Sequence, residues 1–593
     1  MKYIRLIFVL LFLLPALPLS AQWSGVVDAS GGFGLTPPRS EEDFGLIHYM
    51  GKADFQLRYK NPKIQWDTNL GSTYEHKEND SYRFSFSSAS GPEVFQADEI
   101  QRYNLRDTAG INLHSGIRWT PAAGRTYESW IRYKFSLDQG AGSTFKSHFN
   151  DIVKEETGKE KLYVEMPHQL DNNIQVGFRT SHQLGSARRM LKGQLSLERK
   201  HRSKKGSWLM ADTEEEDLKN FRSYRITPES VTQKVDASLQ WADSIISTGP
   251  CRLLLDPGIR FSAEFTNDRN SGATYDPDTD TWRDSTRLRE NFDYLALSLE
   301  PYFSAKFKWK DINAQLDYAP QLYANRLTDE IHQQSIKERR PYPVGNASVN
   351  WQIAPGHKLG FRNKISLKHP SYIQICWYER QGNYLTQIYR GKENLLPTQT
   401  YAFHLDYEFR HKRFLSTTTL SYTNRLDEIE QTFNNETIDG RDYQVFTWVN
   451  AADSRILGFS QQLGWRGKQL QATIGVSNNG TMRKSRESGA VKKTSDWRVW
   501  ANASLSLPNG WSIEAEANYR SKVETFFMVF KQYCTLHAKI QKKFKRMDIY
   551  LQGRDLLDNE TLTQYLSEDG TSSWIEITRQ NRRIVTLGVQ WRF

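Results

Sequence analysis

The chain ends in the nine residues VTLGVQWRF, at positions 585–593, which alternate strictly between apolar side chains and polar or small ones. Successive side chains of a strand point to opposite faces, so the residues from Val585 to Phe593 form one apolar and one polar face. A strand of this kind, ending on an aromatic residue, is typical of a barrel in a bacterial outer membrane, where one face meets lipid. Taken alone, it fits a half-buried strand of a soluble sandwich equally well.

The same alternation recurs along the chain, in segments 111–119, 297–309, 312–318, 401–410 and 511–520. The polar faces of these segments carry full charges of both signs. A one-layer sheet around water tolerates such charges because they stay hydrated, whereas a packed core does not. We therefore expect the following charged residues to face the lumen of a barrel: Arg118, Glu300, Lys306, Lys308, Asp406, Glu408, Arg410, Glu514, Glu516, Arg520 and Arg592.

Connections between the predicted strands fall into two classes that alternate along the chain. The short ones are tight turns, at 61–63, 122–125, 185–189, 247–252, 310–311, 354–357, 410–412, 466–468, 508–510 and 543–547. The long ones are polar, at about 80–100, 141–169, 203–228, 267–290, 326–341, 371–397, 425–443, 483–495 and 557–577. Short periplasmic turns and long extracellular loops are the topology of an outer-membrane barrel. The sequence thus predicts an all-β, antiparallel transmembrane β-barrel of about 22 strands, with both chain termini on the periplasmic side.

Composition agrees with a barrel wall. Hydrophobic residues make up 38% of the chain and aromatic residues 13%, with 17 Trp, 28 Tyr and 30 Phe. A polar chain rich in Trp and Tyr suits a barrel with a polar lumen and aromatic girdles at both membrane interfaces. The three cysteines, Cys251, Cys376 and Cys534, are too far apart for a metal-like spacing and too few for a disulfide framework.

The first residues predict secretion. Lys2 and Arg5 precede an apolar run from Leu6 to Leu19, and small residues follow it, which is the pattern of a signal peptide cleaved near Ala21-Gln22. As a membrane-anchoring helix the run would be short, and prolines interrupt its end. We expect residues 1–22 to be the signal peptide and residues 23–593 to be a barrel in the cell outer membrane.

The formal net charge is +11, and many short turns carry Arg or Lys. Secretion argues against nucleic acid as a partner, so lipid and lipopolysaccharide phosphates of the outer membrane are the predicted partners. The basic turns are either merely solvated or form a collar against inner-leaflet phosphates. A basic run at 200–205 is either a solvated strand end or a contact with lipopolysaccharide.

Four segments in the second half of the chain resemble the barrel of TonB-dependent receptors, closest to the outer-membrane barrel family common in Bacteroidetes. Residues 393–401 (ENLLPTQTY) resemble its NxxLxPExSxxYE segment, and residues 406–409 (DYEF) resemble its LGYEY. Residues 422–433 resemble YYRxIxDxI, and residues 449–465 resemble NxxxSxxxGxExxLxW. Two positions depart from the pattern, since Gln399 and Gln461 stand where acids are usual. The resemblance implies solute transport across the outer membrane.

Such receptors carry a TonB box and a plug domain before the barrel. Here the strand-like segment 25–34 lies close to the predicted cleavage site, and segment 23–120 already has the pattern of barrel strands. We therefore expect neither a plug nor a TonB box in residues 23–593. The lumen of so large a barrel is too wide for its own wall side chains to fill. Three arrangements would close so wide a lumen: long loops folded inward, a partner that fills it, or a flattened barrel.

No cofactor site and no catalytic motif is predicted, so we expect no enzyme. Glu514 and Glu516 lie on one strand face together with Arg520, which indicates a lumenal charge ladder rather than paired catalytic carboxylates. The acidic run at 276–280 lacks the glycine and glutamate of a calcium loop. Two functions remain open: solute transport, or a scaffold subunit of an outer-membrane complex for secretion, assembly or glycan capture. A separate plug protein or a surface lipoprotein is a further candidate partner.

Overall fold

Strand alternation and tight turns produce a closed antiparallel barrel of 22 strands, in agreement with the sequence prediction. The computed structural model describes residues 23–36, 46–88, 95–150, 155–185, 189–211, 224–248, 250–276, 279–285, 288–331, 334–376, 379–381, 387–438, 441–525, 528–557, 561–566, 572–580 and 583–592. The wall strands are β1 (Trp23–Thr36), β2 (Leu46–Lys60), β3 (Ile64–Ser88), β4 (Phe95–Ala122), β5 (Arg125–Asn150), β6 (Glu155–Gln183), β7 (Arg189–Ala211), β8 (Tyr224–Thr248), β9 (Cys251–Asp276), β11 (Glu290–Trp309), β12 (Ile312–Tyr318) continued by β13 (Gln321–Asp329), β14 (Gln334–Tyr342) continued by β15 (Gly345–Ala354), β16 (His357–Lys368), β19 (Thr398–His411), β20 (Phe414–Ile438), β21 (Arg441–Arg466), β22 (Leu470–Ser485), β23 (Val491–Ser506), β24 (Trp511–Arg520), β27 (Tyr533–Lys543), β28 (Met547–Arg554) and β31 (Ile584–Arg592).

Seven shorter strands extend or decorate this wall. They are β10 (Thr281–Asp284), β17 (Glu379–Gln381), β18 (Gln387–Arg390), β25 (Val523–Glu524), β26 (Met528–Phe530), β29 (Thr561–Leu566) and β30 (Ser572–Gln580). The described helices are α2 (Tyr372–Ile375) and the single 3₁₀ turn η4 (Pro508–Gly510). Neither is long or apolar enough to cross a bilayer.

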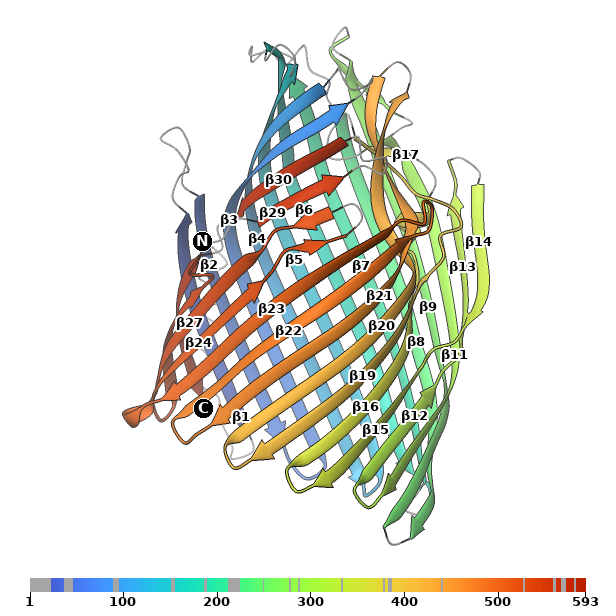
Figure 1. Cartoon of the computed structure of the whole chain (residues 1–593), viewed down its shortest axis with the longest axis vertical. Helices are drawn as coiled ribbons and strands as arrows, with labels where there is room; N and C mark the ends of the chain where they lie inside the picture. Colours follow the sequence, from blue (N-terminus) through green and yellow to red (C-terminus); the bar gives the residue numbers. More distant parts are fainter. Residues whose placement is uncertain are drawn as a thin grey trace.

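The barrel closes where its first and last strands meet. β1 pairs antiparallel with β31, from Val26 opposite Arg592 to Phe33 opposite Val585. The β1–β2 hairpin is short and fills only part of the height of the wall. Above this hairpin, β30 pairs directly with β3, starting with Asn79 opposite Gln580. Figure 1 shows the tilted strands, with the short turns gathered along the lower edge and the chain end C near them.

Two wall strands are interrupted by proline. β12 and β13 are separated by Ala319-Pro320, and β14 and β15 by Pro343-Val344, because proline has no N–H to donate to the ladder. The two interruptions face each other, and Ala319 N donates to Val344 O (2.8 Å), which joins them.

The apolar faces of the strands point outward, where a bilayer would lie. Leu587 is 59% exposed and Leu457 is 68% exposed, whereas Thr586, which alternates with Leu587, is 5% exposed. Eight exposed tryptophans stand close to the short turns: Trp66, Trp119, Trp241, Trp309, Trp351, Trp465, Trp511 and Trp591. They form an aromatic girdle, which is the usual mark of the level of the lipid headgroups.

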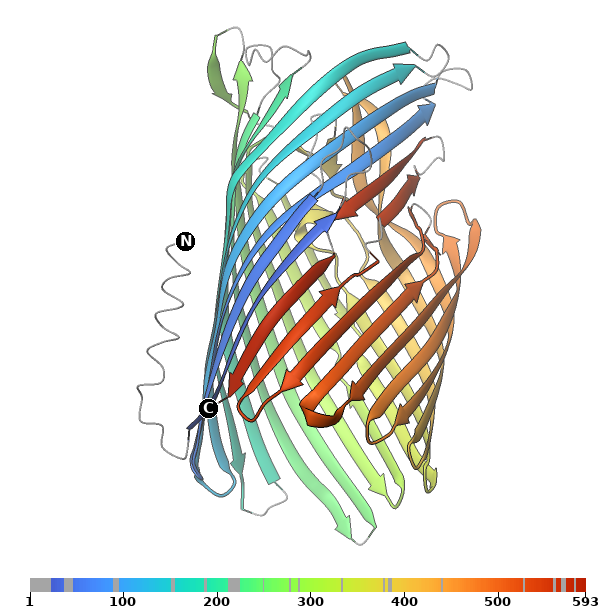
Figure 2. The same cartoon turned by 90° about the vertical axis from the view of Figure 1, so that its left-hand side faces the viewer.

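The ranges predicted for the long connections at 80–100, 141–169, 203–228, 267–290, 326–341 and 425–443 are wrong. Most of those residues are strand, and β3 and β4 pair as far as Ser88 opposite Phe95. Above the membrane both faces of a hairpin meet water, so these segments keep their pairing without apolar alternation. Strands of up to 29 residues result, and Figure 2 shows the wall rising higher on the side of β4–β7 than on the side of β22–β28.

Candidate functional site: the interior of the barrel

Ion pairs between neighbouring strands cover the polar face of the wall, which is the face opposite the exposed apolar side chains. Arg118 donates to Glu128 Oε1 from Nε at 2.8 Å, across β4 and β5. Arg179 of β6 reaches the other oxygen of the same carboxylate at 3.5 Å. Opposite charges on directly paired strands stabilise a sheet by a few tenths of a kcal/mol to about 1 kcal/mol each. Paired charges that remain exposed therefore connect neighbouring strands along the polar face of the wall.

Four more of the predicted lumenal residues belong to such pairs. Asp406 accepts from Arg362 Nε (2.9 Å), and Arg592 donates from one terminal nitrogen to Asp548 Oδ1 (3.1 Å). The Glu408 carboxylate accepts from Arg410 (3.2 Å) on the same strand.

Lys306 and Glu300, both on β11, form the remaining pairs. Lys306 Nζ lies 3.2 Å from Asp256 Oδ2, and Asp256 is almost completely buried, at 2% exposed. Glu300 lies 3.9 Å from Arg260, whose guanidinium also stacks on the Tyr302 ring. Lys308 is exposed and forms no ion pair among the described residues. Burial makes the loss of a partner costly for Asp256, and equally for Asp548, which is 0% exposed beside Arg592.

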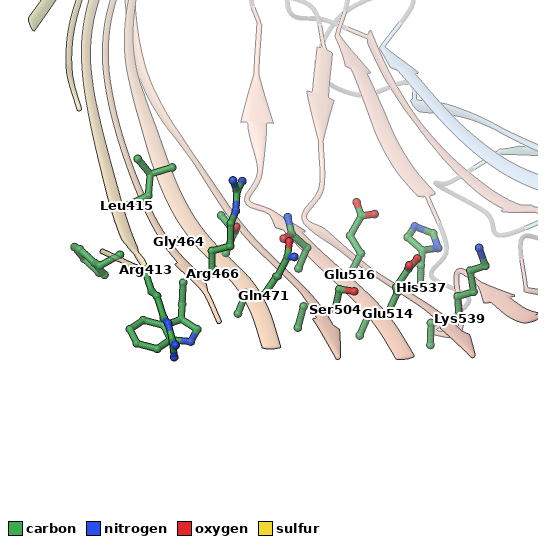
Figure 3. Close-up of a pocket in the computed structure, with 18 of the residues that line it drawn as sticks. Arg413, Leu415, Gly464, Arg466, Gln471, Ser504, Glu514, Glu516, His537 and Lys539 are labelled. Carbon is green, nitrogen blue, oxygen red and sulfur yellow. The ribbon is translucent and has the colours of Figure 1, made fainter. Parts of the chain in front are cut away.

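Glu514 and Glu516 line a cavity of about 490 Å³ at the short-turn end of the barrel. Figure 3 shows them on one side of the strands together with His537 and Lys539 of β27, which pair opposite them in the sheet. Glu516 accepts a hydrogen bond from Asn518 (2.8 Å), and within the described chain neither glutamate forms an ion pair. This part of the wall therefore presents exposed carboxylates beside Lys539 and His537, without the close pairing seen elsewhere.

Arg520 does not join this cavity, and its Nε atom is buried without a hydrogen-bond partner in the described residues.

His537 and Lys539 were not predicted from the sequence. They occupy alternate positions in β27, so the same alternation that revealed the other polar faces would have found them.

The basic run at 200–205 is also part of the network of paired charges. Lys200 pairs with Glu198 (3.1 Å), and Arg202 pairs with Asp171 (2.6 Å). Two cations of the predicted lipopolysaccharide contact are therefore already paired within the wall.

A long connection folds back inside the barrel. It joins β16 to β19, and we call its described parts, residues 369–376, 379–381 and 387–397, the strap. Its helix α2 packs on the polar-face side of β11 and β13, where Phe292, Tyr294 and Leu327 are buried. Figure 2 shows part of the strap, in yellow, behind the front strands and inside the wall. Of the three expected ways to occupy the lumen, the structure shows an inward-folded connection.

Aromatic and polar contacts fix the first half of the strap. The His369 ring stacks on Tyr323, with ring centroids 3.7 Å apart, and its Nε2 donates to Gln321 Oε1 (3.0 Å). The Tyr372 hydroxyl donates to Asp268 Oδ2 of β9 (2.7 Å). Ile375 and Cys376, at 5% and 2% exposed, complete the apolar cluster with Leu395 from the second half.

The second half of the strap reaches a different part of the wall. β18 pairs in parallel with β21, from Gln387 opposite Gln444 to Arg390 opposite Thr447. Asn450 of β21 binds the strap backbone in both directions, since its Oδ1 accepts from Leu396 N and its Nδ2 donates to Leu396 O (both 2.9 Å). The strap therefore spans the interior from β11 and β13 to β21.

The two halves of the strap also hold each other. Lys392 N donates to Gln374 O (2.8 Å), and Gly391 lies directly on the backbone of Cys376. A Cβ atom at position 391 would be 2.0 Å from Cys376 O, so only glycine fits. The residues that resemble a receptor motif, Leu395 and Pro397, are buried here, so that segment serves as the end of the strap.

We predict that acid loosens the strap. Burial lowers the pKa of His369, and the more distant Glu338 carboxylate opposes this lowering only in part. The Nδ1 atom of His369 is buried without a hydrogen-bond partner among the described residues. The side chains that face the ring are those of Tyr323, Tyr342 and Gln321. Since the ordinary pKa of histidine is about 6.5, docking should be strongest above that pH and weaken as the pH falls below it. Hydrogen exchange of the Gln374, Ile375 and Cys376 amides, corrected for intrinsic rates, measures this. Protection that does not change between neutral and mildly acidic pH would contradict it, and His369→Gln should remove the dependence.

No metal site is apparent: among the described residues, no group of three His, Cys, Asp or Glu side chains is placed to hold an ion. In the acidic run at 276–280, Asp276 pairs with Arg283 (2.6 Å), and the Asp280 carboxylate accepts from Tyr275 (2.5 Å). Asp278 lies outside the described residues.

These features define an integral outer-membrane barrel with a polar interior. The chain belongs to the outer membrane protein beta-barrel family, whose model matches residues 251–591. Comparison with curated protein sequences gives no match.

Three transport proteins are among the similar solved structures. The ferric citrate transporter FecA, unliganded, has a TM-score of 0.61 at 10% identity, covering 97% of this chain and 79% of that one. The ferric-catecholate import receptor Fiu from K12 E. coli gives 0.60 at 11% identity, covering 96% and 82%. The copper transporter OprC gives 0.59 at 10% identity, covering 97% and 81%. At such identities the likeness shows the fold alone, that of TonB-dependent receptors.

Proposed function

We propose that this protein is an outer-membrane transport barrel of the TonB-dependent receptor type, of the kind common in Bacteroidetes, without a plug domain in residues 23–593. Polar solutes pass along the charged interior, and the strap restricts their passage. The predicted lumenal residues, together with His537 and Lys539, line the path. The observation that carries the proposal is the strap itself, a segment of the chain docked by defined contacts inside a polar barrel.

Charge pairing along the wall supports a path for polar solutes in general rather than for ions of one sign. Most inner charges are neutralised by a neighbour, as in Arg118 with Glu128 and Arg362 with Asp406. A wall of balanced pairs offers hydrogen-bonding partners without a large net field.

Proteoliposome swelling tests the transport function. We expect vesicles that contain the purified protein to swell in small neutral sugars, slowly for the wild type and faster once the strap is released. Vesicles that contain the heat-unfolded protein are the matched control. If neither the wild type nor a strap-released variant admits sugar, transport through this barrel is refuted.

A scaffold role is the second candidate, and one observation favours it. β4–β6 contain 26–29 residues each, far more than the roughly 9–11 needed to cross a bilayer, so tall hairpins stand above the membrane on one side. Such a rim offers a surface to a separate plug protein or a surface lipoprotein. A fixed partner that co-purifies in constant ratio, with a barrel closed to solutes, would favour this function over transport.

A further inference from the structure

The short-turn edge of the barrel is strongly basic. Its turns and the strand ends beside them carry exposed cations that form no ion pair with any described residue: Lys60, Lys63, Arg125, Arg252, Lys310, Lys412, Arg413, Arg466, Lys468, Lys543, Lys545 and Arg546. Within the described residues of these turns, Asp311 is the single carboxylate. Higher in the wall, many charges of the polar face are paired across strands, as Arg362 is with Asp406. A cluster of unpaired positive charge therefore marks this edge of the barrel.

This edge lies directly below the tryptophan girdle. Lys310 follows Trp309 in the β11–β12 turn, and its Nζ lies 5.4 Å from the centre of that ring. Lys542, a half-buried lysine one residue before Lys543, also belongs to this edge, and its Nζ donates to Asn509 O. The same Nζ lies 5.0 Å from the centre of the Trp511 ring and 5.7 Å from that of Phe544. Tryptophan at a membrane interface marks the level of the headgroups, so these cations stand at the level of lipid phosphates.

Some of the cations point toward the lipid side rather than into the lumen. Figure 3 shows the Arg413 side chain extending toward the short-turn edge, away from Arg466 and Glu516. Lys542 stacks on Trp511, which is 46% exposed on the outer, apolar face. The densest part of the edge comprises the β19–β20 turn (412–413) and the β27–β28 turn (544–546), each with two adjacent cations beside an exposed phenylalanine, Phe414 or Phe544.

We propose that this basic edge is a binding surface for anionic phospholipids of the inner leaflet of the outer membrane. The ligand chemistry is a headgroup phosphate held by Lys and Arg, with its glycerol and acyl chains against the girdle aromatics. Each cation near an anionic membrane surface contributes to attraction, and several together select anionic lipid over zwitterionic lipid. The surface acts independently of what the lumen carries, and it anchors the periplasmic end at a fixed depth.

The test is native mass spectrometry of the protein released from nanodiscs that contain equal parts of phosphatidylglycerol and phosphatidylethanolamine. We expect the wild type to retain phosphatidylglycerol in clear excess. The triple variant Lys542→Gln, Lys545→Gln and Arg546→Gln should lower that excess about fivefold. If this variant does not fold, the pair Lys412→Gln and Arg413→Gln gives the same readout on a neighbouring turn.

The matched control carries the same loss of charge on the polar face of the wall: Lys134→Gln, Lys364→Gln and Lys539→Gln. It should retain phosphatidylglycerol like the wild type. Inorganic phosphate in excess should leave the retained lipid unchanged, because a free anion lacks the acyl chains that meet the girdle. The proposal is overturned if the wild type shows no preference for phosphatidylglycerol, as expected for a surface that binds an acidic periplasmic protein instead. Equal loss in the control, or displacement by free phosphate, would overturn it as well.

Discussion

Replacing Gly391 with alanine is expected to detach the strap from its place inside the barrel. The new Cβ atom would lie 2.0 Å from the carbonyl oxygen and 2.6 Å from the carbonyl carbon of Cys376, which are backbone atoms and have no rotamer to adopt. Overpacking of this kind costs on the order of 3 kcal/mol when the neighbour cannot move. Since the two halves of the strap meet at this point, both should lose their docked form.

Hydrogen exchange and limited proteolysis of the strap measure the effect. We expect faster exchange at Gln374 to Cys376 and new cleavage in the strap, with the wall strands unchanged. The matched control is Gly51→Ala, because Gly51 lies in the wall and a methyl group added there would have no atom within 4 Å. A Gly391→Ala protein whose strap stays as protected as the wild type would show that the close contact does not hold the strap.

Replacing Leu587 with arginine is expected to prevent stable insertion into the membrane. Leu587 is 59% exposed on the apolar face of β31, between the girdle residue Trp591 and the far end of the strand. An arginine on the lipid face costs about 2–4 kcal/mol near the middle of the bilayer and much less near its edges. β31 also closes the barrel against β1, so a strand that fails to insert leaves the wall open.

Unfolding by urea from lipid vesicles, followed by Trp fluorescence, gives the change in stability. Glu514→Gln is the matched control, because Glu514 extends from the opposite, polar face and makes no ion pair within the described chain. It should insert with the stability of the wild type. Equal damage from both substitutions, or none from Leu587→Arg, would contradict the assignment of the two faces.

Most of the wall could be predicted from the sequence because a strand that separates lipid from water must alternate. The pattern in 585–593 corresponds to β31, and the tight turns at 310–311 and 466–468 are present with small shifts. Alternation reports only on the part of a strand that crosses lipid. Above it, β3 to β9 continue with water on both sides, and the sequence carried no signal to distinguish paired hairpins from loops.

The strap could not be predicted, for a different physical reason. Its docking depends on wall residues far away in the chain, such as Tyr323 for His369 and Asn450 for Leu396. No periodicity of the sequence, in the strap or in the wall residues that it contacts, indicates that the two lie together. The resemblance of residues 393–401 to a receptor motif identified the end of the strap without indicating that Leu395 is buried inside the barrel. The cations of the short turns were visible in the sequence, whereas their stacking on Trp309 and Trp511 was not.

If the interior of this barrel is a solute path that the strap restricts, releasing the strap must open it. Single-channel conductance in a planar bilayer measures this, with the wild type, Gly391→Ala and Gly51→Ala compared under the same salt. We expect a small or intermittent conductance for the wild type and for Gly51→Ala, and a large, steady conductance for Gly391→Ala. A wild type that conducts as well as Gly391→Ala, or a Gly391→Ala barrel that stays closed, would show that the strap does not control the path.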